Sequence, residues 1–163
     1  AADDLVWGKG GSYDRMTGGD GADVFAFGPE LSNGIRERDR ITDFEVGVDK
    51  IRLDKAIFDL GSTNGVLDSS QFRTGPEARE AGERIIYKKG TGEIFYDADG
   101  SGSGEAVLFA KVAAGTQLSR SDFEAFVGSS QSNQISDKPV FNEAASVAPM
   151  ADVLLPSEAF AIV

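Results

Sequence analysis

Residues 17–27 read TGGDGADVFAF, a glycine-rich turn with two aspartates that leads directly into an alternating apolar run. Three structures are consistent with such a turn: a plain β-hairpin, a phosphate-binding loop, or one unit of a metal-binding repeat. A phosphate loop requires lysine and serine or threonine after its glycines and then a helix, and two carboxylates would repel the anion. A hairpin explains one Asp-Gly pair but not aspartates that recur along the chain.

The aspartates do recur. Residues 18–26 match the nonapeptide GGxGxDxUx, in which U is apolar, at every specified position. Residues 9–17, KGGSYDRMT, keep the aspartate and the apolar residue but have lost part of the glycine pattern. Residues 2–5, ADDL, repeat the D-x-U element two residues out of phase. We therefore interpret residues 1–28 as the last, degrading turns of a repeat array.

The residue types of this repeat are those that bind calcium. Ca²⁺ takes about six to eight oxygen ligands from carboxylates and backbone carbonyls. Glycine adopts positive φ at little cost, so a glycine-rich turn can direct several carbonyls inward. Each turn would supply part of a ligand shell and the next turn would complete it, which favours the metal-binding repeat over the other two structures.

Composition limits the other functions. The 163 residues carry 27 acidic and 16 basic side chains, a net charge of −11 that argues against nucleic-acid or anionic-membrane partners and favours cations. Cysteine and histidine are absent, which excludes disulfides, thiolate metal sites and HExxH zinc sites in this sequence. No apolar run has the length of a membrane span, and no N-terminal signal peptide is visible.

The remaining pattern predicts short strands and little helix. In chain order we expect two short strands around the Val46-Gly47 turn, a short helical piece at 55–60, a hairpin at 85–96, a strand at 106–112, a short helix within 118–127 that begins at Ser119 or Ser121, and a polar linker from 128 to about 148.

These motifs resemble the RTX (hemolysin-type) calcium-binding repeats. Residues 39–51, DRITDFEVGVDKI, resemble the segment that follows the β-roll in serralysin-type C-terminal domains, and residues 95–102, FYDADGSG, are similar to a segment of RTX-containing secreted proteins. The likeness covers residues 1–127. Only one repeat is intact, and Lys9 and Ser12 replace glycines, so fewer ions are expected than in a long array.

The resemblance implies an all-β fold with little helix. A short parallel β-roll over residues 1–28 is expected to continue into a β-sandwich-like C-terminal cap over residues 29–127. Residues 128–163 are expected to form a linker and a C-terminal tail.

The resemblance also implies a set of calcium ligands. They are the side chains of Asp14 and Asp23, the backbone carbonyls near Gly10, Ser12, Gly18, Gly19, Asp20 and Gly21, and further ligands from Asp39 and Glu30. An alternative role for Asp39, Asp43 and Asp49 is to cap turns, and we prefer that role for Asp43 and Asp49.

Residues 97–102, DADGSG, look like the first half of an EF-hand loop. The position of the closing glutamate is occupied by Leu108, so a complete EF-hand is excluded. Two interpretations remain open: an isolated Asp/Gly turn, or a partial calcium site in which Asp97 and Asp99 are completed by ligands from elsewhere.

The C-terminal residues 151–163, ADVLLPSEAFAIV, are consistent with an edge strand or with the uncleaved signal of type I secretion, and the two are compatible. We expect a monomeric, calcium-triggered folding and secretion module, the C-terminal part of a larger secreted bacterial protein without an N-terminal signal peptide. Any catalytic domain would precede Ala1. The alternatives are an Asp/Glu-pair glycosidase and a polysaccharide-binding module. Trp7, Tyr13, Tyr87 and Tyr96 are the stacking candidates of such a module, although we prefer core or surface packing for each of these rings.

Overall fold

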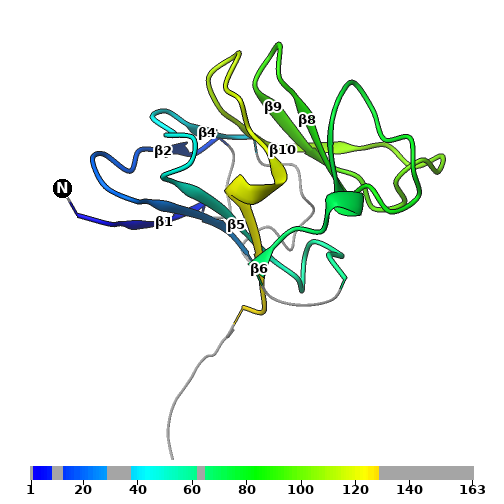
Figure 1. The fold of residues 1–163 in the computed structure, drawn as a ribbon, viewed down its shortest axis with the longest axis horizontal. Helices are drawn as coiled ribbons and strands as arrows, with labels where there is room; N and C mark the ends of the chain where they lie inside the picture. The colour runs from blue at the N-terminus through cyan, green and yellow to red at the C-terminus, as the bar shows by residue number, and fades with distance from the viewer. Residues whose placement is uncertain (1, 9–12, 29–37, 62–64, 129–163) are drawn as a thin grey trace, which may run out of the picture. The chain divides into compact units, whose positions relative to one another are not determined.

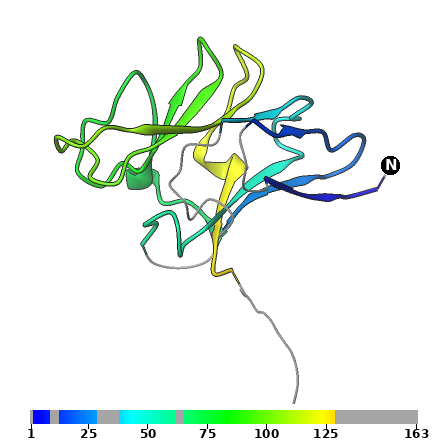
Figure 2. The same ribbon diagram turned by 180° about the vertical axis from the view of Figure 1, so that it is seen from behind.

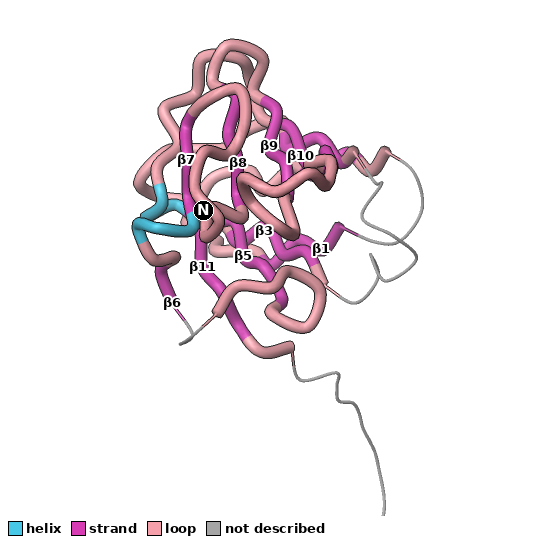
Figure 3. The backbone as a smooth tube through the Cα atoms, turned by 90° about the vertical axis from the view of Figure 1, so that its right-hand side faces the viewer, coloured by secondary structure: helices cyan, strands magenta, loops and turns pink. Residues whose placement is uncertain are grey.

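The computed structural model describes residues 2–8, 13–28, 38–61 and 65–128. Within these ranges the regular elements are β-strands and two 3₁₀ helices of three residues each, η2 (Ser69–Gln71) and η3 (Arg120–Asp122), and no α-helix is found. Figure 3 shows the strands in magenta and the short helical piece in cyan. The expected all-β class is confirmed.

The strands form two sheets. The first sheet has the order β1-β3-β5-β11-β6, and its members are β1 (Leu5–Gly8), β3 (Val24–Phe27), β5 (Lys50–Asp54), β11 (Phe123–Phe126) and β6 (Gly65–Val66). Strands β1, β3, β5 and β11 are parallel to their neighbours, whereas β6 runs antiparallel to β11.

The second sheet has the order β2-β4-β10-β9-β8-β7. Its members are β2 (Arg15–Met16), β4 (Asp39–Ile41), β10 (Val107–Lys111), β9 (Glu93–Tyr96), β8 (Ile85–Lys88) and β7 (Phe72–Thr74). The pairs β2–β4, β4–β10 and β7–β8 are parallel, and β10, β9 and β8 form an antiparallel meander.

From β1 to β5 the chain alternates between the two sheets. Strands β1, β3 and β5 enter the first sheet, β2 and β4 enter the second, and every neighbouring pair is parallel. These blue and cyan strands lie together on the left of Figure 1, and on the right when the molecule is seen from behind in Figure 2. Such a winding places one turn of chain directly beside the next, which a ligand shell shared between turns requires.

One apolar core joins the repeat region to the rest of the chain. The Phe109 ring of β10 lies edge-on to Phe27 of β3, with centroids 5.2 Å apart, and it also contacts Phe58 at 5.0 Å. Phe58 in turn lies 5.2 Å from Tyr96 of β9. All four rings are buried, and each contributes about 1.5–3 kcal/mol of transfer free energy.

Several predicted elements are found where the sequence placed them. The hairpin of β8 and β9 closes through the Gly92 N–H, which donates to the Lys88 carbonyl at 2.8 Å, and β10 occupies the predicted 106–112 strand. The two strands around Val46-Gly47 also exist, but they do not pair with each other: β4 belongs to the second sheet and β5 to the first.

Two predicted helices are wrong. Residues 55–60 form turns, because the Ile57 and Phe58 N–H groups both donate to the Asp54 carbonyl and the chain then leaves the helical path. In the 118–127 stretch, Ser119 caps only the three-residue η3, and the following residues extend into β11. The apolar residues that suggested a helix there are buried as a strand parallel to β5.

Candidate metal centre

An aspartate stands directly before each of the four parallel strands of the first sheet. We call Asp4, Asp23, Asp49 and Asp122 the aspartate ladder. The strand registers align these residues to within one position at the same end of the sheet. The sequence thus places four aspartates at the same end of the first sheet, one before each of its four parallel strands.

Three of the four ladder carboxylates, those of Asp23, Asp49 and Asp122, accept a hydrogen bond from the backbone of a neighbouring winding. Asp23 Oδ1 accepts from the Asp4 N–H at 2.9 Å, and Asp49 Oδ1 accepts from the Asp23 N–H at 3.0 Å. Asp122 Oδ1 accepts from the Gly47 N–H at 3.2 Å, although the two residues are 75 positions apart. Hydrogen bonds with an ionised acceptor are about twice as strong as neutral ones, so the ladder fixes the spacing of the windings.

The second sheet has a shorter version of this arrangement. Asp39 Oδ1 accepts from the Asp14 N–H at 2.9 Å, so two of the predicted ligands lie side by side. Asp43 accepts from both Gly18 and Gly19, at 3.1 and 2.8 Å. Asp49 accepts from the Glu45 N–H and so caps the turn before β5, as expected, whereas Asp43 does not cap that turn but holds the glycine turn of another winding.

The glycine turn at residues 18–21 wraps closely around the Asp23 carboxylate. A Cβ atom at Gly18 would collide with that carboxylate, and one at Gly21 would collide with the Ala2 carbonyl. Gly19 and Gly21 also adopt φ values of +96° and +139°, which L-residues rarely populate. Glycine is therefore required in this turn for space and for backbone conformation.

One carboxylate oxygen in this turn has no partner. Asp23 is only 1% exposed, and its Oδ2 atom is buried without a hydrogen bond from any described residue. By contrast, both oxygens of Asp49 accept hydrogen bonds, the second from the Glu45 N–H at 2.7 Å. A buried carboxylate oxygen is costly unless a proton or a cation compensates it.

The unpartnered Oδ2 atom of Asp23 is a possible ligand for calcium. The described residues contain no group of three or more acidic side chains that could hold a metal by themselves. Calcium, however, accepts backbone carbonyls as readily as carboxylates. No hydrogen bond within the described ranges uses the carbonyls of Gly18, Gly19 or Gly21, so carbonyls are available beside Asp23 and the residues fit a site dominated by carbonyls.

The other predicted ligands of the repeat region differ in their setting. Gly10, Ser12 and Glu30 lie outside the described residues. Asp20 is exposed, and its carbonyl accepts from the Ala2 N–H at 3.2 Å. Asp20 occupies the position that the repeat pattern leaves variable, and its side chain faces solvent.

The DADGSG loop after β9 is a separate feature. Burial raises the pKa of Asp97, and its neighbour Asp99 raises it further, whereas a hydrogen bond from the Gly104 N–H lowers the pKa of Asp99. Asp97 Oδ1 accepts from the Asp99 N–H at 3.3 Å and Asp99 Oδ2 accepts from the Gly104 N–H at 3.0 Å. The two carboxylates therefore close their own loop, as an Asp/Gly turn does.

Two of the four rings considered for sugar stacking are packed in the core, in line with the packing role preferred for them from the sequence. Tyr87 is fully buried and its hydroxyl donates to the Thr116 carbonyl at 2.7 Å. Tyr96 is 7% exposed and its hydroxyl accepts from the Asp59 N–H at 2.9 Å. Trp7 is partly exposed and packs edge-on against Phe126, and Tyr13 alone of the four is largely exposed, at 65%.

Sequence reasoning missed Asp4, Asp49 and Asp122 as members of one array. The available signal was an aspartate directly before an apolar strand, which all three share with Asp23. Their unequal separation along the chain hid the relationship, because the nonapeptide period does not connect them.

Comparison with protein families gives a match to the family described as Peptidase M10 serralysin C terminal, over residues 2–124. The chain belongs to the serralysin C-terminal family. The matched range contains all four ladder aspartates and strands β1 to β10, so family membership rests on the repeat turns and the following sheets together. Neither a curated protein nor a solved structure matches the chain significantly. Within the described part of the chain, no helix is long and apolar enough to cross a membrane.

Proposed function

We propose that the chain is a calcium-binding RTX-type module that folds on extracellular calcium and directs type I secretion of a larger bacterial protein. Membership of the serralysin C-terminal family supports a role in a secreted protein. We assign the folding role to residues 1–127, with repeat turns over 1–28 and a β domain over 29–127, and the export role to residues 128–163. The chain acts as a monomeric, non-catalytic appendage, and catalysis belongs to another part of the protein.

The buried, unpartnered Oδ2 of Asp23 carries the calcium assignment. Asp23 would hold the ion together with the carbonyls of Gly18, Gly19 and Gly21. Asp14 and Asp39, which lie together beside the second sheet, are the candidates for a further site. A bound calcium ion supplies the positive charge that compensates carboxylates aligned along the sheet edge.

The ladder explains why folding would depend on the ion. A net charge of −11 opposes compaction, and the ladder gathers acidic groups rather than dispersing them. Where a metal binds only the folded state, its binding free energy contributes directly to folding. Extracellular calcium modules have Kd values of about 10⁻⁴–10⁻³ M, so the repeat turns would stay unfolded in the cytosol and fold outside.

The test is a calcium titration of the full chain followed by circular dichroism, with Asp23→Asn and Asp20→Asn compared. Asparagine retains an oxygen for the Asp4 N–H but removes the charge. We expect Asp23→Asn to raise the calcium midpoint at least about tenfold. Asp20→Asn, three residues away on an exposed side chain, is the matched control and should change it little. A spectrum that is the same in EDTA and in millimolar calcium would overturn the proposal.

The secretion role rests on the sequence of the C-terminal residues, which lie outside the described part of the chain. Glu158 is followed by the apolar residues AFAIV. In cells with a type I exporter, removal of residues 158–163 should abolish export of the chain, whereas Asp23→Asn should leave export intact and yield an unfolded product outside. Export that persists without these residues would refute the signal while leaving calcium binding untouched.

A further inference from the structure

The outward face of the second sheet concentrates positive charge on an acidic protein. In the register of this sheet, Arg15 of β2 lies beside Arg40 of β4, and Arg40 lies beside Lys111 of β10. Three cations thus stand in a row on adjacent strands, about 4.8 Å apart in the pairing direction. Like charges directly opposite each other destabilise a sheet, so this row has a cost that the fold alone does not explain.

Lys111 at the end of the row lies opposite Glu93 of β9, whereas neither Arg15 nor Arg40 forms an ion pair with a described carboxylate. The ion pairs found in this part of the chain are Arg52–Glu124 and Arg73–Glu83, and neither involves a residue of the row. Arg15 and Arg40 are exposed and Lys111 is partly exposed. The guanidinium of Arg38 lies over the exposed Tyr13 ring, 5.8 Å from its centroid, and adds a fourth cation beside the row.

These residues line a groove. A cavity of about 410 Å³ is bordered by the row, Arg38, Tyr13, Asp14, Glu93 and Leu108. A second cavity of about 1080 Å³ shares Arg38, Glu93 and Leu108 with it and adds Lys88, Phe95 and Glu105. The two cavities therefore adjoin, and we call them together the groove, whose lining includes residues of β2, β4, β10, β9 and β8.

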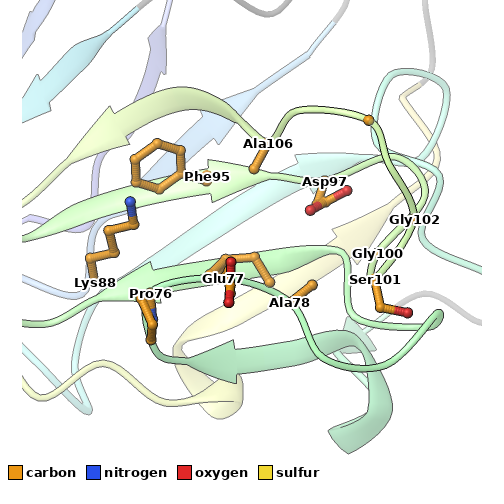
Figure 4. A pocket seen from close by; sticks show the side chains of 12 residues that line it. Pro76, Glu77, Ala78, Lys88, Phe95, Asp97, Gly100, Ser101, Gly102 and Ala106 are labelled. Atoms are coloured by element: carbon orange, nitrogen blue, oxygen red, sulfur yellow. The ribbon is translucent and has the colours of Figure 1, made fainter.

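The groove continues toward the DADGSG loop. A third cavity of about 400 Å³ shares Lys88 and Phe95 and reaches Asp97. In Figure 4, Lys88 and Phe95 occupy one side of this cavity and Asp97 and Ser101 the other. The Lys88 Nζ lies 4.3 Å from the Phe95 ring centroid, which holds the ammonium group at the groove surface.

We propose that this groove binds an acidic polysaccharide, a linear chain of sugars that carry carboxylate groups. The cation row matches a repeated negative charge, and the exposed Tyr13 ring offers an apolar face to a sugar ring. Glu93 and Asp14 line the same groove, and their carboxylates accept hydrogen bonds from sugar hydroxyls.

The small number of exposed rings disfavours a nucleic acid. Single-stranded nucleic acids are held by several exposed aromatic rings on which successive bases stack. Within the groove, Tyr13 is the one largely exposed ring of the described residues, and Phe95 lies beneath Lys88.

The experiment compares a galacturonic acid hexamer, neutral maltohexaose and hexathymidylate as ligands of the full chain, by calorimetry at one fixed calcium concentration. We expect the uronate to bind at least about tenfold more tightly than the other two, and added sodium chloride to weaken it. Equal binding of maltohexaose or of hexathymidylate would overturn the proposal.

Variants locate the site. The double variant R15Q/R40Q should weaken uronate binding at least about tenfold, because it removes two charge-assisted contacts. The control R79Q/K89Q changes the net charge equally at exposed positions outside the groove, and should alter affinity less than about twofold. Unchanged binding in R15Q/R40Q, or an equal loss in the control, contradicts the site. The circular dichroism spectrum of each variant at the same fixed calcium concentration verifies that it is folded, whether or not calcium drives the folding, so this result is independent of the calcium assignment.

Discussion

The turn closed by Asp23 and the turn closed by Glu83 use a carboxylate in the same way but differ in their counter-charge. Asp23 lies in the repeat region and accepts from the backbone of the next winding, with its second oxygen buried and unpartnered. Glu83 lies between β7 and β8, accepts from the Arg79 and Glu80 N–H groups, and has the Arg73 guanidinium 3.5 Å away. Glu83 thus has its own cation in Arg73, whereas the described residues give Asp23 Oδ2 no hydrogen-bond partner.

The largest expected effect tests whether the two regions unfold together. Phe109→Ala removes the ring that contacts Phe27 and Phe58, and should lower the free energy of unfolding by about 3–5 kcal/mol at saturating calcium. Leu108→Ala on the same strand is the control, because Leu108 is only partly buried. Chemical denaturation should show one transition, with the same midpoint for a signal from the repeat region and a signal from the C-terminal part of the fold. Two separate transitions would mean that the regions are independent.

Hydrogen exchange tests the comparison directly. When calcium is removed, the protection of amides in β1 and β3 against exchange should fall about 100-fold. Calcium at about a hundred times its Kd stabilises the folded state by about 2.7 kcal/mol, which corresponds to this factor. Amides of β8 and β9 should lose less protection. Backbone hydrogen bonds close their hairpin, and in the turn before β8 the Glu83 carboxylate already pairs with Arg73. Equal losses in both pairs of strands would contradict the division into calcium-dependent and calcium-independent regions.

Gly18→Ala should cost about 1–3 kcal/mol of stability and raise the calcium midpoint, because the added methyl group collides with the Asp23 carboxylate. Gly90→Ala in the β8–β9 turn is the matched control, since a Cβ atom there meets no neighbour within 4 Å. Thermal unfolding with and without calcium measures both quantities. A calcium-independent loss in Gly18→Ala would show that the turn has a structural role only.

The smallest effect concerns Glu83. Burial raises its pKa, but the Arg79 and Glu80 N–H groups and the Arg73 guanidinium outweigh burial and hold the pKa below the ordinary value of 4.5. Its contribution to stability is therefore complete above pH 4.5 and is lost as the pH falls through the lowered pKa. Glu83→Gln should cost about 1–2 kcal/mol at pH 7 and flatten the loss of stability on the acid side.

Denaturation of Glu83→Gln between pH 3 and pH 7, with and without calcium, measures this change. The effect should be the same in both conditions because Arg73 supplies the counter-charge. A dependence on calcium would place Glu83 with the repeat region and break the comparison.

Local patterns were sufficient to predict the elements whose partners are close in sequence. The hairpin of β8 and β9, and β10 after it, were recognisable from alternation and turn residues. The repeat identified Asp23 and the required glycines because conformation and space at these positions depend on adjacent residues.

The remaining features depend on partners distant in sequence. Residues 123–126 were assigned to a helix because their apolar spacing fits one, whereas parallel pairing with β5 makes them a strand. The packing of both sheets buries Tyr87 and Tyr96, whereas the sequence could not distinguish core packing from surface packing for these rings. The cation row could not be seen in the sequence, since Arg15, Arg40 and Lys111 become neighbours only through the strand register.

The position of β11 has a consequence for the order of assembly. It is the last strand of the described chain, yet it lies inside the first sheet, between β5 and β6, and pairs over a separation such as the 72 positions from Arg52 to Glu124. Contacts of such high order must wait for loop closure, so they form slowly. A chain released with its N-terminal repeats complete but β11 absent would present β5 as an open edge. The rate-limiting event of folding should therefore be the insertion of β11. In single-jump refolding experiments, the amides of β11 should be the last to become protected.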